Sequence, residues 1–330
     1  MNLDNKRILV IGGAGLIGSH VVEQLLESNV KEIIVYDNFF RGTRDNLREA
    51  LFDPRVRIFP DGGDILQTEV LERAMEGVDG VFHLAALWLL QCHEYPRAAF
   101  DVNIRGTFNV AEAAIRQGVK RLVYSSSASV YGDAVELPMT EDHPYNNQTF
   151  YGATKISGEH MLKALGERYG LNWCGLRYMN VYGPRQDYRG AYIAVMMKIL
   201  DRIDQGLSPI VYGDGTQQYD FVYVGDVARA NVCAMEADVS GVNFNVGRGI
   251  GTTIKELTEL LLRLSDSSLP IEYRDSDLTF VSNRIGCTSA AEKELGFRWN
   301  VDLEEGMKKL IEWRRRDIGQ VNERRMVVGL

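Results

Sequence analysis

Residues 8–18 read Ile8-Leu9-Val10-Ile11-Gly12-Gly13-Ala14-Gly15-Leu16-Ile17-Gly18, an apolar run followed by spaced glycines. An amphipathic pattern over Ile17–Glu27 then predicts a helix directly after the apolar strand and its turn. In such a turn, Gly12 permits the sharp bend, Gly15 lets backbone approach a pyrophosphate, and Gly18 lets the helix pack on the strand. The spacing is G-x-x-G-x-x-G rather than the commoner G-x-G-x-x-G, and a glycine-rich loop without a ligand is the competing interpretation. Because the glycine turn lies directly between a strand and a helix, the pattern favours a dinucleotide bound at the helix N-terminus.

The first half of the chain alternates apolar runs with amphipathic stretches. The predicted strands are Arg7–Ile11, Glu32–Tyr36, Val56–Phe59, Gly80–Leu84, Arg121–Ser125 and Asn172–Leu176. The predicted helices are Ile17–Glu27, Gln67–Glu76, Arg97–Gln117 and Tyr151–Tyr169. Continuous apolar runs are typical of parallel strands covered on both faces. The repeated strand–helix units therefore predict an α/β fold with a doubly wound, Rossmann-type parallel sheet.

After residue 182 the pattern becomes less regular, which predicts a second part of the molecule. The expected elements are helices at Tyr192–Gln205, Asp226–Met235, Thr253–Leu264 and Leu303–Arg316, and a strand at Pro209–Tyr212. We expect a Rossmann domain over residues 1–182 and a smaller C-terminal α/β substrate-binding lobe over residues 183–330, with some segments returning to the first domain. A ligand should bind between them, at the carboxyl ends of the strands.

Composition excludes several classes of protein. With 45 acidic and 37 basic side chains the net charge is −8, so a nucleic-acid partner is not expected. The four cysteines are far apart and the histidines have no metal-ligand spacing, which favours a reducing compartment and no metal site. No secretory signal pattern and no apolar run approaching 18 residues is present, so we expect a cytoplasmic protein with no membrane partner. The basic run Arg314–Arg316 is interpreted as a solvated helix face.

An acidic residue ends the second predicted strand, 19 residues beyond Gly18. There Asp37 can accept both hydroxyls of a ribose and repel a 2′-phosphate, which indicates NAD as the cofactor. Arg41 and Arg44 follow it and keep NADP open as an alternative. Residues after the third and fourth strands stand where the rest of a dinucleotide would lie: Asp64, Ile65, Leu84, Ala85 and Ala86.

Tyr151 and Lys155 are four residues apart on a predicted helix, so they share one face. A nearby cation favours the phenolate, which would lower the pKa of Tyr151 from about 10 toward neutrality. The fifth strand delivers Ser125–Ser129, and a small hydroxyl there can bond a substrate oxygen and relay a proton to Tyr151. Chance helix spacing and a strand-end serine cluster are the competing interpretations.

With these motifs together, the chain resembles the extended short-chain dehydrogenase/reductases, in the nucleotide-sugar epimerase/dehydratase family typified by UDP-glucose 4-epimerase. The resemblance runs from the glycine turn to at least Phe297. It rests on Gly12–Gly18, Asp37-Asn38, His83–Ala86, Asn103, Ser125–Gly132, Tyr151–Lys155 and Leu176–Pro184.

The resemblance implies roles for residues at matching positions. Tyr151 would take a proton from a sugar hydroxyl, Lys155 would assist it and hold the nicotinamide ribose, and Ser127 would be the catalytic hydroxyl. The implied NAD-binding residues are Gly12, Gly15, Leu16, Ile17, Gly18, Asp37, Asn38, Arg41, Gly42, Asp64, Ile65, Leu84, Ala85, Ala86, Asn103, Ser125, Tyr151, Lys155 and Tyr178. The implied residues for a nucleoside-diphosphate sugar are Ser127, Asn180, Arg185, Tyr219 and Arg284.

Departures from the family pattern narrow the reaction. Where the 4,6-dehydratases carry an Asp-Glu pair this chain has Ala128-Ser129, and Ser129 also replaces a glutamate usual in the decarboxylases. Epimerisation at carbon 4 through a 4-keto sugar is therefore the leading hypothesis. The alternative is an NAD(P)-dependent 4-keto-sugar reductase or another nucleotide-sugar oxidoreductase or dehydratase. A non-catalytic NAD-binding regulator is disfavoured because Tyr151 and Lys155 are retained.

Two further expectations follow from the resemblance. Tyr219 stands where many relatives carry an arginine that holds the substrate diphosphate, and Arg185 and Arg284 are the candidate replacements. The helices Arg97–Gln117 and Tyr151–Tyr169 would pair across a two-fold axis as a four-helix bundle, so the resemblance implies a homodimer.

Overall fold

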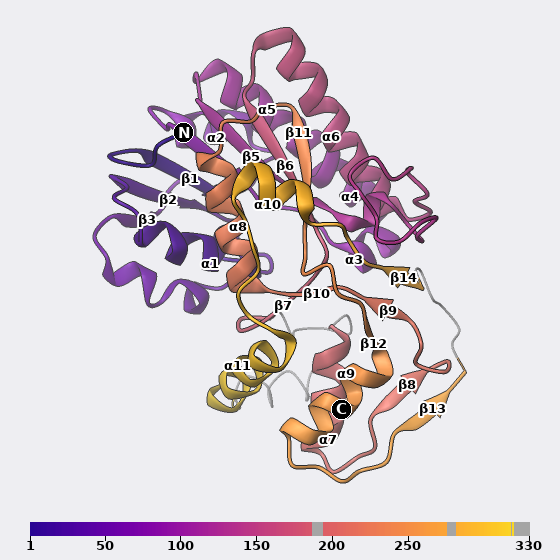
Figure 1. Ribbon diagram of the computed structural model, residues 1–330. Helices are drawn as coiled ribbons and strands as arrows, with labels where there is room; N and C mark the ends of the chain where they lie inside the picture. The colour runs from indigo at the N-terminus through magenta and orange to yellow at the C-terminus, as the bar shows by residue number, and fades with distance from the viewer. Residues whose placement is uncertain (187–193, 276–281, 318, 320–330) are drawn as a thin grey trace.

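The computed structural model describes residues 1–186, 194–275, 282–317 and 319. Within these residues a seven-stranded sheet has the order β11-β6-β5-β4-β1-β2-β3, and every neighbouring pair is parallel (Figure 1). Its strands are β1 (Arg7–Ile11), β2 (Glu32–Tyr36), β3 (Val56–Ile58), β4 (Gly80–His83), β5 (Arg121–Ser127), β6 (Trp173–Tyr178) and β11 (Val242–Val246). The predicted Rossmann-type α/β fold is confirmed, and each of the six strands predicted in the first half starts within one residue of its predicted position.

Helices cover both faces of this sheet because its strands alternate between two cores. Ile8 and Val10 of β1 belong to one apolar cluster and Leu9 and Ile11 to the other, as the two-residue period of a strand requires. The first cluster includes α1 (Leu16–Leu26), α8 (Val224–Glu236) and α10 (Ser289–Leu295). The second includes α2 (Thr68–Met75), α5 (Gly106–Arg116) and α6 (Phe150–Tyr169).

The strand β11 comes from the second half of the chain and was not predicted. Its sequence Val242-Asn243-Phe244-Asn245-Val246 alternates instead of being apolar throughout. The two amides are nevertheless bonded inside the protein: Asn245 Nδ2 donates to the Met139 carbonyl at 2.9 Å, and Asn243 Nδ2 donates to Glu159 Oε2 at 3.2 Å. Hydrogen-bond partners from distant parts of the chain thus allow polar residues in this edge strand.

The single helix predicted over Arg97–Gln117 is wrong in detail. The chain instead forms α3 (Leu89–Glu94), α4 (Pro96–Ala99), a π-helical turn η3 (Phe100–Arg105) and then α5. A π turn inserts a residue into the helical ladder and often lies at a functional site. Here η3 carries Asn103, which is buried. Short 3-10 helices lie at η1 (Arg44–Leu47), η2 (Ala50–Phe52) and η4 (Ala128–Val130).

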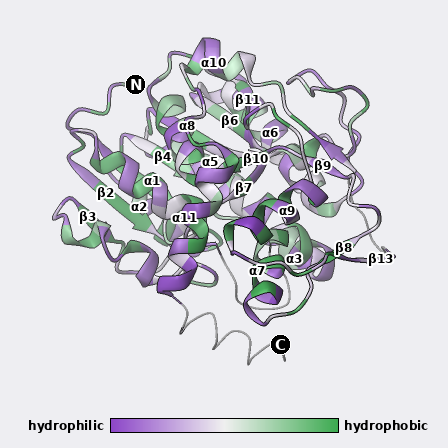
Figure 2. Cartoon of the chain, turned by 60° about the horizontal axis from the view of Figure 1, so that its bottom comes forward, coloured by the Kyte–Doolittle hydropathy of each residue, from purple (hydrophilic) through white to green (hydrophobic). Residues whose placement is uncertain are grey.

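The second half of the chain builds a smaller lobe beyond the carboxyl ends of the strands, in the lower part of Figure 1. Its helices are α7 (Val195–Asp204), α9 (Ile254–Leu264) and α11 (Leu303–Arg316). Its small sheets pair β7 (Asn180–Tyr182) with β10 (Phe221–Tyr223), β8 (Ile210–Tyr212) with β13 (Glu272–Arg274), and β9 (Gln218–Tyr219) with β12 (Thr252–Thr253) and β14 (Asn283–Arg284). In Figure 2 the lobe's helices carry both apolar and polar residues, as amphipathic helices do, and a third core gathers their apolar sides.

The start of α7 and the surroundings of Arg314 bear on two of the expectations for this lobe. The predicted helix Tyr192–Gln205 starts outside the described residues, and α7 begins at Val195. Arg314 was interpreted as solvated, but it is buried and its guanidinium donates to Asp201 at 2.5 Å, so that interpretation is wrong for this residue. No helix among the described residues is long and apolar enough to cross a membrane.

Candidate active site and cofactor cavity

The glycine turn brings backbone segments closer together than side chains would allow. Gly12 has φ +79°, and a Cβ on it would lie 2.7 Å from the Ala85 nitrogen. A Cβ on Gly18 would lie 2.1 Å from the Gly12 oxygen, so this glycine is needed for α1 to pack on the turn. A Cβ on Gly15 meets only the Gly12 oxygen, at 3.3 Å. The space over Gly15, at the start of α1, thus fits the close backbone approach of a pyrophosphate.

Asp37 lies at the end of β2, beside this turn. Its Oδ2 accepts the Ala14 N–H at 2.9 Å and its Oδ1 accepts the Phe39 N–H at 2.8 Å. Burial raises the pKa of Asp37 and these two backbone bonds oppose the rise. The carboxylate is thereby fixed in orientation at the edge of the cavity, where ribose hydroxyls can reach it.

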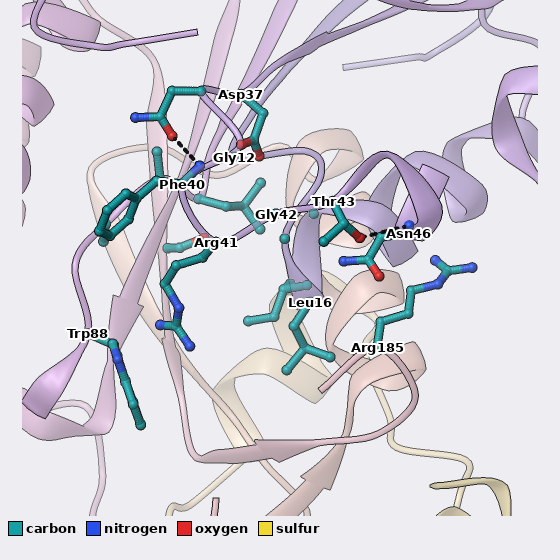
Figure 3. A pocket seen from close by; sticks show the side chains of 18 of the residues that line it. Gly12, Leu16, Asp37, Phe40, Arg41, Gly42, Thr43, Asn46, Trp88 and Arg185 are labelled. Carbon is teal, nitrogen blue, oxygen red and sulfur yellow. Dashed lines mark hydrogen bonds between the residues drawn. The ribbon is translucent and has the colours of Figure 1, made fainter. Parts of the chain in front are cut away.

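A cavity of about 960 Å³ runs from Asp37 to Tyr151 (Figure 3). Every predicted NAD-binding residue except Asn103 lines it, and so does Arg185. Ser127, Asn180, Tyr219 and Arg284 are outside its lining. Its size and its glycine cradle fit a dinucleotide.

Several residues that line the cavity were not predicted. They include Phe40, Thr43, Asn46, Arg48, Trp88, Trp313 and Arg316. Trp88 lies in an apolar stretch, and nothing in such a stretch shows which residue turns toward a cavity. Residues near Trp313 come from α11, and their approach depends on how the second lobe folds back.

The proton-transfer residues come from α6 and the end of β5. Thr149 caps α6 by accepting the Gly152 N–H at 3.1 Å, which places Tyr151 in the first turn. Lys155 Nζ donates to the Ser125 carbonyl at 2.7 Å and lies 5.7 Å from the centroid of the Tyr151 ring. The Ser127 hydroxyl is near enough to the Tyr151 phenol to oppose the rise in its pKa. The structure therefore brings Ser127, Tyr151 and Lys155 together.

The protonation of this group differs from the sequence-based expectation. Burial raises the pKa of Tyr151 to about 12, against the opposing effects of the Ser127 hydrogen bond and the charges of Arg284 and Arg41. Burial also lowers the pKa of Lys155 to about 8. The Lys155 ammonium is directed at the Ser125 carbonyl and is itself desolvated, so burial opposes the lowering of the Tyr151 pKa that the sequence predicts.

Asn103 is buried behind the cavity rather than in its lining. Its side chain accepts the Leu87 N–H at 2.7 Å and donates to the Leu87 carbonyl at 2.9 Å and to Thr154 Oγ1 at 3.1 Å. It therefore ties the loop after β4 to α6, between Tyr151 and Lys155. Any support it gives to a cofactor acts through the backbone of Leu87.

The predicted sugar-nucleotide residues fall into two groups. Arg284 pairs with Tyr219 in the register of β14 and β9. Its positive charge acts to lower the pKa of the Tyr151 phenol. Arg284 is half-buried, and its Nε, which solvent does not reach, has no hydrogen-bond partner among the described residues. Arg185 instead lies on the cofactor side, in an ion pair with Glu23 of α1. Asn180 begins β7, where its backbone N–H donates to the Asp220 carbonyl at 2.9 Å.

The residues after Ser127 carry no acid. Ala128 and Ser129 are both buried in η4. The carboxylate behind the serine cluster is Glu159, whose Oε2 is 2.7 Å from the Arg177 guanidinium and whose Oε1 accepts from Ser126 at 2.5 Å. Glu159 is thus held in a buried network away from the cavity.

Known proteins resemble this chain over nearly its whole length. Residues 8–247 match the model of the NAD dependent epimerase/dehydratase family. A putative UDP-glucose 4-epimerase from Methanocaldococcus jannaschii is 34 % identical over 312 residues, which covers 93 % of this chain and 97 % of that protein.

Solved structures agree with this assignment. The UDP-glucose 4-epimerase of Thermotoga maritima with UDP-glucose is 35 % identical, with a TM-score of 0.87 and coverage of 94 % of this chain and 99 % of that one. The UDP-N-acetylglucosamine 4-epimerase of Methanobrevibacter ruminantium with UDP-N-acetylmuramic acid is 32 % identical, with a TM-score of 0.89 and coverage of 96 % and 99 %. Nucleotide-sugar decarboxylases and dehydratases are also similar. The chain belongs to the NAD dependent epimerase/dehydratase family.

Proposed function

We propose that this protein epimerises a nucleoside-diphosphate sugar at carbon 4 through a 4-keto sugar. The observation that carries the proposal is the hydroxyl pair Ser127 and Tyr151 at the end of the cavity, next to Ala128 and Ser129. This arrangement can move one proton at one carbon. It offers no carboxyl group at the positions from which elimination of water would be assisted.

The cavity residues fit NAD, which when bound would supply the acceptor and donor of hydride. Gly15 and the start of α1 would hold the pyrophosphate, and Asp37 the adenosine ribose. Leu84, Ala85 and Tyr178 would line the nicotinamide end, where Tyr178 is held by Ser125 and Asn231 at 2.9 Å each.

Tyr151 would remove the proton from the sugar's 4-hydroxyl and return it after the sugar has turned. Because burial raises the pKa of Tyr151, the phenolate needs cationic help. Arg41 and Arg284 act in this direction. Ser127 would bond the same sugar oxygen, so the proton moves along a short path between two hydroxyls and the phenol.

The substrate diphosphate would be held by Arg284. The half-buried Arg284 has a solvent-inaccessible Nε without a partner among the described residues, and a partly desolvated guanidinium binds a phosphate strongly. Tyr219 neighbours it across β9 and β14 and would pack against the nucleotide rather than carry charge. Asn180, on β7, would donate to the diphosphate.

The decisive experiment incubates purified protein with UDP-glucose, and separately with UDP-N-acetylglucosamine, while the sugar is followed by NMR. Epimerisation gives the 4-epimer with no net change at 340 nm. Turnover only with stoichiometric NADH or NADPH consumption would identify a reductase instead. Formation of a 4-keto-6-deoxy sugar would identify a dehydratase, and loss of carbon dioxide in a parallel incubation with UDP-glucuronic acid would identify a decarboxylase.

We also propose that the protein is a homodimer through α5 and α6. Aromatic side chains stand in solvent on and beside these helices: Phe100 is 49 % exposed, Phe108 40 % and Phe150 41 %. An exposed aromatic face on two packed helices is the kind of surface that a symmetric four-helix bundle buries.

We further propose a division of the chain into two domains and a location in the cell. The division into a cofactor domain over residues 1–182 and a substrate lobe over residues 183–330 is supported by the separate third core, with β11 and α8 returning to the first domain. A cytoplasmic location is supported by the four cysteines, all free thiols.

A further inference from the structure

We propose that Arg41 and Trp88 form a clasp that joins the two walls of the cavity and retains the bound dinucleotide. The Arg41 guanidinium lies 4.8 Å from the centroid of the Trp88 ring, within cation–π range. The two residues come from different loops, one after β2 and one after β4, and both line the cavity. In Figure 3 the Arg41 and Trp88 side chains lie near each other at the left of the view.

The loop that carries Arg41 is fixed to the glycine turn. A Cβ on Gly42 would lie 2.7 Å from Ala14, so the two segments are in direct contact. The Ala14 carbonyl accepts from the Thr43 N–H at 3.2 Å and from Asn46 Nδ2 at 2.8 Å. These contacts hold Arg41 at a set position relative to the place where a pyrophosphate would bind.

The Trp88 side is fixed to the catalytic helix. Trp88 precedes α3, and its carbonyl accepts the Cys92 N–H at 2.9 Å. The preceding residue, Leu87, is held on both its N–H and its carbonyl by Asn103. Asn103 is bonded in turn to Thr154 of α6. The clasp therefore connects a support on the phosphate side with a support on the Tyr151 side.

Each member has the chemistry to hold a dinucleotide. A guanidinium presents a planar set of donors that suits phosphate oxygens, and its charge is strengthened in a cavity with little water. The Trp88 indole keeps the guanidinium in place and supplies apolar cover. Dissociation of the cofactor then requires this contact to open. Slow release would serve the proposed epimerisation, in which reduced cofactor has to stay until hydride returns to the same sugar.

The test measures cofactor release without any sugar, so it does not depend on the proposed reaction. Wild type, Arg41→Gln, Trp88→Ala and the double variant are loaded with NADH and mixed with excess NAD, and the loss of bound-NADH fluorescence gives the release rate. Each single variant should release NADH about tenfold faster than wild type. Because both substitutions remove the same contact, the double variant should also be about tenfold faster, well below the product of the two single effects.

Arg44→Gln is the matched control. Arg44 is in the same segment and lies 5.3 Å from the centroid of the Phe39 ring, but it does not line the cavity. Its release rate should equal that of wild type. Trp88→Phe, which keeps a ring, should fall between wild type and Trp88→Ala and also serves if Trp88→Ala does not fold.

Two results would overturn the clasp. One is NADH release within twofold of wild type in Arg41→Gln and in the folded Trp88 variant. The other is a double variant whose effect on the release rate equals the two single effects multiplied, which would show that the two residues act independently.

Discussion

The Lys155 ammonium donates a hydrogen bond to the Ser125 carbonyl at 2.7 Å, and this contact ties α6, the helix that carries Tyr151, to the end of β5. The same ammonium lies over the Tyr124 and Tyr151 rings, at 5.1 and 5.7 Å from their centroids. Lys155 is therefore a fixed and desolvated cation, and its loss should affect both proton transfer and folding stability.

Lys155→Met should change the pH dependence of stability. The pKa of Lys155 is about 8 in the folded protein, below its value of 10.5 in an unfolded chain. Below pH 8 the burial of the charged ammonium therefore lowers the free energy of unfolding. Wild-type stability should therefore rise relative to the variant between pH 8 and 10.5, by up to roughly 3 kcal/mol. Urea unfolding of both proteins across this range checks the sign, and a constant difference would contradict it.

Tyr151→Phe should reduce turnover by about 10²–10⁴-fold, the range typical of a general acid–base group. The phenol's ring contacts are kept, so the melting temperature and the NAD content of the purified protein should match wild type. Activity within a few-fold of wild type would remove Tyr151 from the proposed mechanism.

Substitution of Gly18 should affect folding, whereas substitution of Gly15 should affect NAD binding. Gly18→Ala places a Cβ 2.1 Å from the Gly12 oxygen, so it should destabilise the fold by several kcal/mol, as overpacking against backbone does. Gly15→Ala meets only one oxygen at 3.3 Å and should fold, but bind NAD more weakly. Thermal unfolding and NAD titration distinguish the two, and equal behaviour of both variants would contradict these roles.

Glu159→Gln should destabilise the protein by about 3–5 kcal/mol, because it leaves the buried Arg177 guanidinium without its anion. The pair is 2.7 Å apart, with both side chains almost fully buried. Glu304→Gln is the control, since Glu304 pairs with Arg263 on the surface. Its unfolding midpoint in urea should stay at the wild-type value, and a similar loss in both variants would show that burial does not decide the effect.

The double variant Phe100→Glu, Phe108→Glu should be a monomer, because two charges on the exposed aromatic face oppose its burial against a second copy. Light scattering at micromolar concentration should give a dimer mass for wild type. Phe52→Glu, at an 81 % exposed position in η2, should leave the mass unchanged. A wild-type monomer would rule out the proposed interface.

The sequence predicts the sheet well because its strands are covered on both faces and read as apolar runs. Asp37 and the glycine turn could be found for a related reason, since their spacing follows from local geometry around one ligand. In contrast, β11 carries two asparagines whose partners are distant in sequence, and the π turn at Asn103 has no local signature.

Contacts between segments that are far apart in the chain could not be predicted from the sequence either. Nothing local indicates that Arg41 meets Trp88, or that Arg314 is buried against Asp201. The raised pKa of Tyr151 has the same origin, because it depends on how completely the fold excludes water from the phenol.

The position of β11 also affects how the protein is made on the ribosome. Strand β6 is complete at residue 178, but its neighbour on the open side is not synthesised until residue 246. At typical elongation rates the nascent chain carries this unpaired strand edge for on the order of several seconds. Such an edge can pair with other chains. Covering this edge therefore depends on the synthesis of β11, even though the glycine turn and the residues Ser127, Tyr151 and Lys155 have been synthesised before it.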